Sequence, residues 1–336
     1  MDFVRSYVLL ADGGGGVESQ KLIDTVFMPF LRDVMVGSGE DAGIGAIKGE
    51  NLVVSTDSYV VKPLFFTGGD IGKLSVCGSC NDVAVTGGKA QFLSAGFLIE
   101  EGFKVEDLRR VVESFALALN AAGVKLLSAD TKVLPRGALD GMFINTCAIG
   151  ELCYKGLSAF KIPQDCAVLV SGYIGTHGAV IYSLREGISL SSKLESDCQF
   201  LYPFLEPVFA SNVRVYGVRD ATRGGLGGVL CEWAAGSLIG ITLEEEKLPV
   251  LDEVRGVCEL LGFEPYYLAN EGMCVLCVHW EDAEVALRLM REAGACGAEI
   301  VGYTHKEYAG KVLLKTHLGG RRFLDAPSGE LLPRIC

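Results

Sequence analysis

The feature that most constrains the fold of this chain is the alternation of apolar strands with amphipathic helices in two halves of similar size. In the first half, apolar runs typical of strands occupy residues 52–56, 92–99, 124–129 and 142–149. Residues 105–122 repeat their apolar side chains with a 3.6-residue period, which predicts a helix. A more polar connection at 152–163 separates the two halves.

The second half predicts the same mixture of elements. We expect strands at 167–171, 239–243, 273–278 and 299–303, and helices at 226–235, 251–261 and 283–293. A length of 336 residues also favours two domains over one. The sequence therefore predicts an α+β protein with domains at 37–152 and 153–317, an N-terminal arm at 1–36 and a mobile tail at 318–336.

The composition excludes several classes of protein. Hydrophobic residues make up 49% of the chain and charged residues 21%, which favours a packed core over disorder. The net charge of −12 disfavours a nucleic-acid surface, which requires a basic face. A nucleotide ligand is still compatible with this charge, because Mg²⁺ can carry the positive charge. Since neither a long apolar run nor a signal-peptide pattern occurs, we expect a cytoplasmic protein whose 12 cysteines are free thiols.

Four aspartates stand where an apolar run meets a turn of glycine or other small residues: Asp41, Asp57, Asp82 and Asp220. Each of them alone could serve as a helix cap or a turn residue. Carboxylates are also the ligands with which proteins hold Mg²⁺ on the phosphates of a substrate. The four positions together make a magnesium–phosphate site an alternative to four separate caps or turns.

The cysteines offer two readings. Two C-x-x-C pairs, Cys77 with Cys80 and Cys274 with Cys277, invite a zinc site. The second pair lies in an expected strand, where side chains three apart point to opposite faces and cannot easily share one ion. The first pair falls in an expected turn or helix start, where chelation is possible.

Both ends of the chain carry features typical of moving segments. Cys336 places a thiol at the last position, after a segment interrupted by Pro327, Gly329 and Pro333. A thiol on such an arm could travel to a distant site. Near the other end, the run that includes Gly14 and Gly15 is either a flap whose N–H groups approach phosphates or a mobile linker.

Seven segments together resemble the PurM/selenophosphate-synthetase superfamily of ATP-using enzymes and, within it, the carbamoyl dehydratases of hydrogenase maturation. These segments are residues 37–43, 55–63, 81–85, 129–133, 219–226, 270–272 and 333–336. The first blocks are typical of the superfamily, and the terminal Pro333-Arg334-Ile335-Cys336 is typical of the dehydratases. The resemblance runs from residue 37 to the end of the chain.

The resemblance implies a two-domain PurM-like fold, with a mixed N-terminal sheet at the core of a homodimer and a C-terminal α+β sandwich. It implies that Asp41, Asp57, Asp82 and Asp220 hold Mg²⁺ on ATP. Further nucleotide-binding residues by the same resemblance are Thr56, Asn81, Gly14 and Gly15. It also implies that Lys132 and Glu271 act on a carboxamide carried by the thiol of Cys336.

The activity implied by the resemblance is ATP-dependent dehydration of that carboxamide to an S-cyanide, which supplies cyanide for the iron of a [NiFe] hydrogenase. The implied partners are the carbamoyltransferase HypF and an iron-carrying HypC–HypD scaffold complex. Two alternatives stay open from the sequence. One is another enzyme of the superfamily, such as a selenophosphate synthetase or an aminoimidazole ribonucleotide synthetase. The other is a non-catalytic carrier that uses its thiols to hold a metal.

Overall fold

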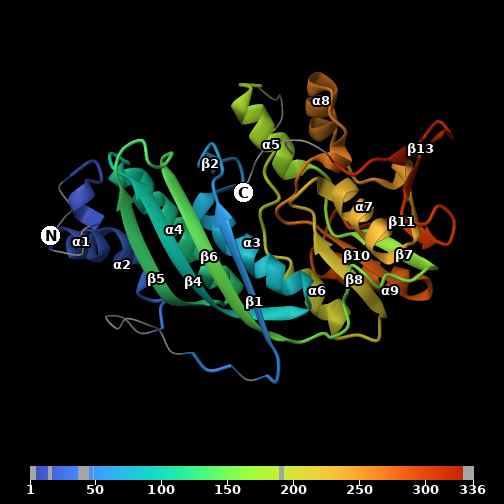
Figure 1. Ribbon diagram of the computed structural model, residues 1–336, viewed down its shortest axis with the longest axis horizontal. Helices are drawn as coiled ribbons and strands as arrows, with labels where there is room; N and C mark the ends of the chain where they lie inside the picture. The colour runs from blue at the N-terminus through green and yellow to red at the C-terminus, as the bar shows by residue number, and fades with distance from the viewer. Residues whose placement is uncertain (1–4, 14–16, 37–44, 48, 189–192, 328–336) are drawn as a thin grey trace.

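The computed structural model places the two halves of the chain in two domains, each with its own β-sheet (Figure 1). It describes residues 5–13, 17–36, 45–47, 49–188 and 193–327. The N-terminal sheet has four strands in the order β1-β6-β4-β5, and the C-terminal sheet has seven in the order β13-β12-β9-β11-β7-β10-β8. Within these described ranges, no helix has the length and apolar character needed to cross a membrane.

The N-terminal sheet is mixed, because β4 and β5 run parallel while the other neighbours are antiparallel. Its strands are β1 (Leu52–Tyr59), β4 (Gly88–Glu100), β5 (Lys125–Leu134) and β6 (Met142–Leu152), with a small hairpin of β2 (Phe65–Phe66) and β3 (Gly69–Asp70). Its helices are α1 (Val17–Leu22), α2 (Met28–Leu31), α3 (Ile71–Val85) and α4 (Val105–Ala122).

Alternation along these strands explains why the N-terminal helices lie on one face of the sheet. In β6, every second residue from Met142 to Ala148 is fully buried, and the residues between them are only partly buried. The buried Met142, Ile144 and Ala148 pack in the same core as α3 and α4. The opposite face of the sheet is only partly buried, and Val54 on β1 remains 53% exposed. This domain therefore presents a second sheet face that the described residues do not cover.

The C-terminal sheet is covered by helices on both faces. Its strands are β7 (Cys166–Val170), β8 (Val215–Asp220), β9 (Gly240–Glu244), β10 (Cys274–His279), β11 (Glu299–His305), β12 (Val312–Lys315) and β13 (Arg321–Leu324). Its helices are α5 (Thr176–Arg185), α6 (Tyr202–Phe209), α7 (Gly225–Ser237), α8 (Asp252–Leu261) and α9 (Ala283–Glu292). Trp233 of α7 lies in one core and Met290 of α9 in another, so the central strands β7 and β10 are apolar on both sides.

The expected strands and the helices at 105–122, 226–235, 251–261 and 283–293 are present, whereas α3, α5 and α6 were not predicted. Helix α3 was not predicted because it is buried on all sides. Every residue except Lys73 and Asp82 is buried, so its sequence has no amphipathic period. Its Cys77 and Cys80 are therefore inside a helix and not in a turn or at a helix start.

Two expected boundaries are wrong in detail. The described parts of residues 5–36 are not a free arm, because Val8, Leu22 and Val26 are fully buried in the N-terminal core. The expected tail from residue 318 starts too early, because Arg321–Leu324 form β13 and pair with β12. Residues 328–336, which include Cys336, lie outside the described residues.

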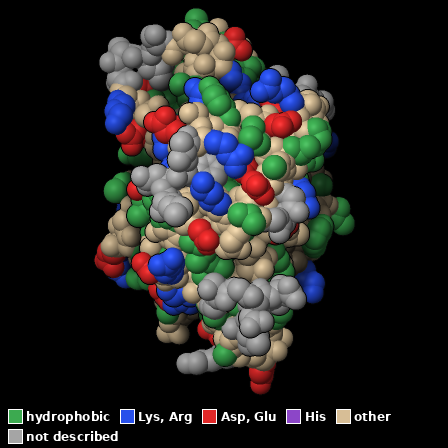
Figure 2. Space-filling view, turned by 90° about the vertical axis from the view of Figure 1, so that its left-hand side faces the viewer, with side chains coloured by type: hydrophobic (Ala, Val, Ile, Leu, Met, Phe, Trp, Pro, Cys, Tyr) green, Lys and Arg blue, Asp and Glu red, His purple; other side chains and the backbone are tan. Residues whose placement is uncertain are grey.

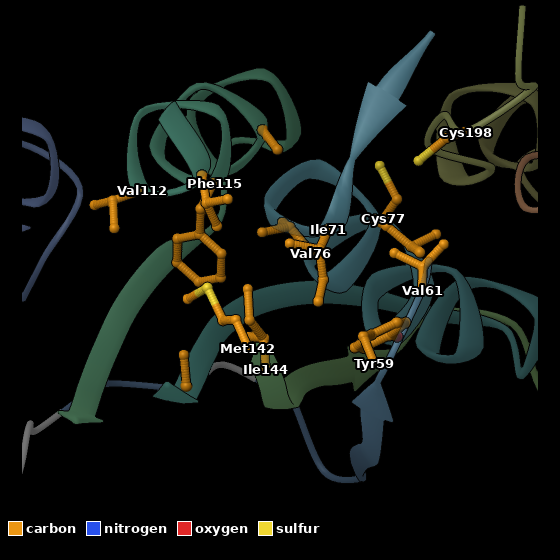
Figure 3. Close-up of a cluster of buried hydrophobic side chains, with 14 of the residues drawn as sticks. Tyr59, Val61, Ile71, Val76, Cys77, Val112, Phe115, Met142, Ile144 and Cys198 are labelled. Atoms are coloured by element: carbon orange, nitrogen blue, oxygen red, sulfur yellow. The ribbon is translucent and has the colours of Figure 1, made fainter. Parts of the chain in front are cut away.

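The two domains meet along α3. The main-chain N–H of Ser196 donates to Thr67 O at 2.8 Å, which joins residues 193–201 to the loop between β2 and β3. Cys198 and Cys77 of α3 point toward one another across this seam (Figure 3). Helices α5 and α8 of the second half share one continuous core with the N-terminal domain.

The face shown in Figure 2 carries Lys, Arg, Asp and Glu side chains interspersed with hydrophobic ones. Among its coloured side chains the charges of one sign do not form a continuous field.

The N-terminal core yields a stability prediction at Phe97. This ring is 1% exposed and packs edge-to-face against Phe27 and Phe115, at centroid distances of 5.2 and 5.3 Å. Phe97→Ala should lower the free energy of unfolding by about 3–5 kcal/mol, because it removes both contacts and leaves a cavity. Phe160→Ala, at a ring that is 74% exposed, is the matched control and should change it by less than about 0.5 kcal/mol in urea denaturation. Equal losses in both variants would contradict this packing.

Candidate active site

A cavity of about 580 Å³ lies between the two domains and gathers polar residues from both. The N-terminal domain contributes the middle of β1 and the last turn of α3, which carry Asp57 and Asp82. The C-terminal domain contributes the end of β8, with Asp220, and the turn before β10, with Glu271. Three of the four predicted magnesium aspartates therefore line one cavity together with Glu271, while Asp41 lies outside the described residues.

Asp82 is held at the cavity wall by a neighbour on β1. Ser55 Oγ donates to Asp82 Oδ2 at 2.6 Å. Burial raises the pKa of Asp82, and the nearby carboxylate of Asp57 raises it further, whereas the hydrogen bond from Ser55 lowers it. The carboxyl group thus sits where its negative charge is poorly compensated by the protein.

Asp220 shows the same effect more strongly. Burial raises its pKa to about 6, and the charge of Asp82 contributes in the same direction. Mutual repulsion between carboxylates drawn to one cavity is relieved by a cation. The site is therefore electrostatically incomplete without positive charge from a ligand.

The side chain of Glu271 is buried at the wall of the cavity. It is 3% exposed, and its Oε1 has no hydrogen-bond partner among the described residues. Burial raises the pKa of Glu271 well above its usual range, and the neighbouring Cys198, Asp197 and Asp220 add to the effect. An unpartnered buried oxygen that lines a cavity is suited to receive a proton from a bound molecule.

Two arginines on the cavity wall were not predicted as site residues. Arg223 lies 3.7 Å from Asp57 in an ion pair, and Arg219 lies 3.4 Å from Glu232 in another. Both stand in the segment Arg219-Asp220-Ala221-Thr222-Arg223, in which the prediction singled out Asp220 alone. Guanidinium groups match the geometry of phosphate oxygens, so these arginines are candidates for binding a polyphosphate.

Of the two other predicted nucleotide-binding residues that the structure describes, Thr56 lines the cavity and Asn81 does not. Thr56 lines the cavity, and its hydroxyl donates to the main-chain oxygen of Thr146 at 3.0 Å. Asn81 is 1% exposed and is not on the cavity wall, because its amide oxygen and nitrogen both bind protein groups across the domain seam. In this structure the side chain of Asn81 bonds to protein groups, and its contact with a nucleotide stays a prediction.

Lys132 lies away from the carboxylates that line the cavity of its own chain. Strand β5 is three positions from β1 in the sheet, which separates their backbones by about 14 Å. Val133 and Tyr59 both face the helix-covered core, so by strand alternation Asp57 lies on the covered face and the exposed Lys132 on the open one. The described chain therefore does not bring Lys132 to Glu271. Gly14, Gly15 and Cys336 fall outside the described residues.

The donor set of the cavity fits Mg²⁺ bound together with a phosphate. Asp57, Asp82 and Asp220 offer the oxygen ligands that this ion prefers, and it commonly takes one or two carboxylates plus phosphate oxygens. Nowhere in the described ranges do three His, Cys, Asp or Glu side chains converge closely enough to hold a metal unaided. Asp57, Asp82 and Asp220 are therefore the residues that could hold Mg²⁺ together with a phosphate ligand.

Comparison with known protein families places this fold and site in a class. The model of the AIR synthase related protein N-terminal domain matches residues 39–152, and that of the C-terminal domain matches residues 163–315. The chain is thus a member of the AIR synthase related, or PurM-like, proteins, with an ATP-binding fold.

Full-length relatives identify the particular family. The chain is 42% identical over 338 residues to carbamoyl dehydratase HypE of Rhodobacter capsulatus, covering 98% of each protein. Among solved structures it is similar to hydrogenase maturation protein HypE in complex with ATP, with a TM-score of 0.93 and 39% identity, covering 98% of this chain and all of that one. It is also similar to a chain of a HypE–HypF complex, with a TM-score of 0.78 and 39% identity, covering 93% of this chain and all of that one. The chain belongs to the HypE family of carbamoyl dehydratases in hydrogenase maturation.

The raised pKa of Asp220 predicts how stability depends on pH in the absence of a divalent cation. An acid with a raised pKa binds its proton more tightly in the folded state, so its contribution favours folding at low pH. That contribution is lost as the pH rises from about 4 through the folded pKa of about 6. Asp220→Asn has no such loss.

The stability of Asp220→Asn relative to the unmutated protein should therefore increase by about 1–3 kcal/mol between pH 4 and pH 7. Urea denaturation at a series of pH values with a chelator present measures this difference, and MgCl₂ at pH 7 should reduce it. A difference in the free energy of unfolding that stays constant across the pH range would show that the charge of Asp220 does not destabilise the folded state.

Proposed function

We propose that this protein dehydrates a carboxamide carried on the thiol of its own Cys336 to an S-cyanide, with conversion of ATP to ADP and phosphate. The cyanide then serves the iron of a [NiFe] hydrogenase. The observation that carries the proposal is the free Oε1 of Glu271 in a cavity whose wall also holds Asp57, Asp82 and Asp220. The reaction requires a proton acceptor for the amide nitrogen beside a metal–polyphosphate site that activates the amide oxygen.

The chemistry divides between the ligand and the protein. The amide oxygen is a poor leaving group, and transfer of a phosphoryl group from bound ATP converts it into a good one. Asp57, Asp82 and Asp220 would hold Mg²⁺ on the phosphates, and Arg219 and Arg223 would neutralise further negative charge. Positioning and charge neutralisation account for most of the catalysis of phosphoryl transfer.

Two N–H protons leave the amide nitrogen in this reaction. One is released to the solvent as the amide oxygen takes the phosphoryl group, and Glu271 would remove the other as the phosphate leaves and the C≡N bond forms. Its buried environment makes its carboxylate a strong base once the proton is lost. Cations that enter the cavity with the nucleotide favour that loss, because an opposite charge nearby stabilises the carboxylate. The same environment that disfavours the ionised form in the empty cavity thus yields an effective base in the loaded one.

The place of Lys132 supports a homodimer in the proposed mechanism. Its side chain emerges on the open face of the N-terminal sheet, where Val54 and its neighbours leave apolar area uncovered by the described residues. Packing of two such faces would bury this area and bring Lys132 of each chain into the interface. We therefore assign the action of Lys132 on the carboxamide or the phosphate to the assembled homodimer.

The proposed partners follow from the family. A HypE–HypF complex is among the similar solved structures, which supports HypF as the carbamoyl donor for Cys336. A HypC–HypD complex carrying iron would accept the cyanide. We propose the cytoplasm as the location of these steps.

Replacement of Asp82 tests the metal–nucleotide site. Asp82→Asn should lower Mg²⁺-dependent ATP hydrolysis by at least roughly 10²-fold, because it removes one charge from a site that works by charge stabilisation. Asp165→Asn, at an aspartate outside this cavity, is the control and should hydrolyse ATP normally. Phosphate release by the purified proteins provides the readout, and normal turnover in a folded Asp82→Asn protein would exclude Asp82 from the site.

Replacement of Cys336 tests the carrier thiol. Cys336→Ala should bind ATP normally and accept no carbamoyl group, since the thiol forms the bond to the carbonyl carbon. Mass spectrometry of the protein after incubation with HypF and its substrates measures this acceptance. Carbamoylation of Cys336→Ala at another cysteine would remove Cys336 from the mechanism.

A further inference from the structure

The main chain that carries Glu271 is held almost entirely by side chains. The N–H of Glu271 donates to Asp197 Oδ1 at 3.2 Å, and its carbonyl oxygen accepts from Asn81 Nδ2 at 3.1 Å. Glu271 thus has both main-chain polar groups bound to protein while its Oε1 remains free toward the cavity. The backbone of Glu271 is therefore fixed by hydrogen bonds, while its carboxylate remains available to a bound molecule.

The next residue is fixed in the same way. The N–H of Gly272 donates to Asp197 Oδ2 at 3.1 Å, and its carbonyl oxygen accepts from Gln199 Nε2 at 3.0 Å. A Cβ at Gly272 would lie 1.8 Å from the carbonyl oxygen of Asp197, so only glycine permits this approach. The turn therefore lies flat against residues 197–199.

Asp197 is the centre of this arrangement. Its Oδ2 also accepts from Asn270 Nδ2 at 2.7 Å, so its two oxygens receive three donors from three consecutive residues. All three partners are N–H groups, and only a carboxylate offers acceptors on both oxygens. An asparagine in its place would turn an NH₂ group toward one of these donors.

The same clamp joins the base to the other domain. Asn81 belongs to α3 and stands next to Asp82, and its Nδ2 also donates to Gln199 O at 2.9 Å while its Oδ1 accepts from Leu201 N at 2.8 Å. One short segment, residues 197–201, is therefore bound at once to the turn of Glu271 and to the helix of a metal-site aspartate. Displacement of that segment would move the base relative to the phosphate site.

We propose that Asp197 is a positioning residue that aims the Glu271 carboxylate at the amide nitrogen of the carried carboxamide, with Asn81 and Gln199 completing the clamp. This inference rests on the function proposed above. Asp197 touches neither substrate nor nucleotide in this scheme and acts only through Glu271. A misplacement of about 1 Å in a reacting group can cost roughly 10²-fold in rate.

Asp197→Asn is the decisive variant, measured in single turnovers of the full-length protein that has first been carbamoylated on Cys336. Dehydration should slow by roughly 10–100-fold, while the KM for ATP and the rate of carbamoylation stay within about twofold. Asp12→Asn is the matched control: Asp12 is fully buried and accepts from Arg5 and from Leu9 N in the N-terminal domain. It should leave dehydration unchanged.

A double-mutant cycle with Glu271→Gln separates positioning from general damage. If Asp197 acts through Glu271, Asp197→Asn should cause little further loss in a Glu271→Gln background, because residues that act as a unit are non-additive. Multiplicative losses would overturn the proposal, as would a normal dehydration rate in Asp197→Asn.

A second variant guards against a protein that fails to fold. Gln199→Ala removes only the bond to Gly272 O from an exposed side chain, and should slow dehydration severalfold, again without effect in the Glu271→Gln background. A normal rate in Gln199→Ala would contradict the clamp. Absence of water loss in the unmutated protein would contradict the proposed function itself, and so differs from a failure confined to Asp197.

Discussion

The structure depends on the hydrogen bonds that Asn81 makes across the seam between the two domains. From the C-terminal part of α3, its amide binds main-chain groups of Gln199, Leu201 and Glu271. Asn81 is buried, and loss of a partner there would leave polar groups unsatisfied at a cost of about 1–3 kcal/mol each. This contact fixes the distance between the aspartates of the N-terminal domain and the carboxylate of the C-terminal domain, on which the site depends.

Charge explains why the fold builds a cavity in that place. Asp82, Asp220 and Glu271 all have a raised pKa, with burial as the largest cause in each. Such a cluster opposes folding at neutral pH unless a cation compensates it, so binding energy is available for a metal–polyphosphate ligand. Arg219 and Arg223 supply part of the compensation from the same wall.

Sequence patterns predicted the amphipathic helices and the short apolar strands, and missed α3, α5 and α6. The helix at 105–122 alternates buried and exposed residues, whereas α3 is buried all round and gave no period. The family resemblance implied Asp41, Asp57, Asp82 and Asp220 as magnesium ligands and Glu271 as a catalytic residue, and all of these except Asp41, which lies outside the described residues, line one cavity. Sequence patterns could not show that Asn81 bonds across the domain seam or that Lys132 lies on the opposite sheet face, because both facts depend on pairing between segments far apart in the chain.

The central claim is that Glu271, held at the domain seam, completes an ATP-dependent dehydration on Cys336. The most direct measurement is the mass of the C-terminal peptide from carbamoylated protein before and after ATP and Mg²⁺ are added. The account predicts that the peptide loses the mass of one water molecule only when ATP is present, and that Glu271→Gln keeps the carbamoyl group and slows this loss by roughly 10²–10⁴-fold. Water loss at the normal rate in Glu271→Gln, or water loss without ATP, would contradict the account.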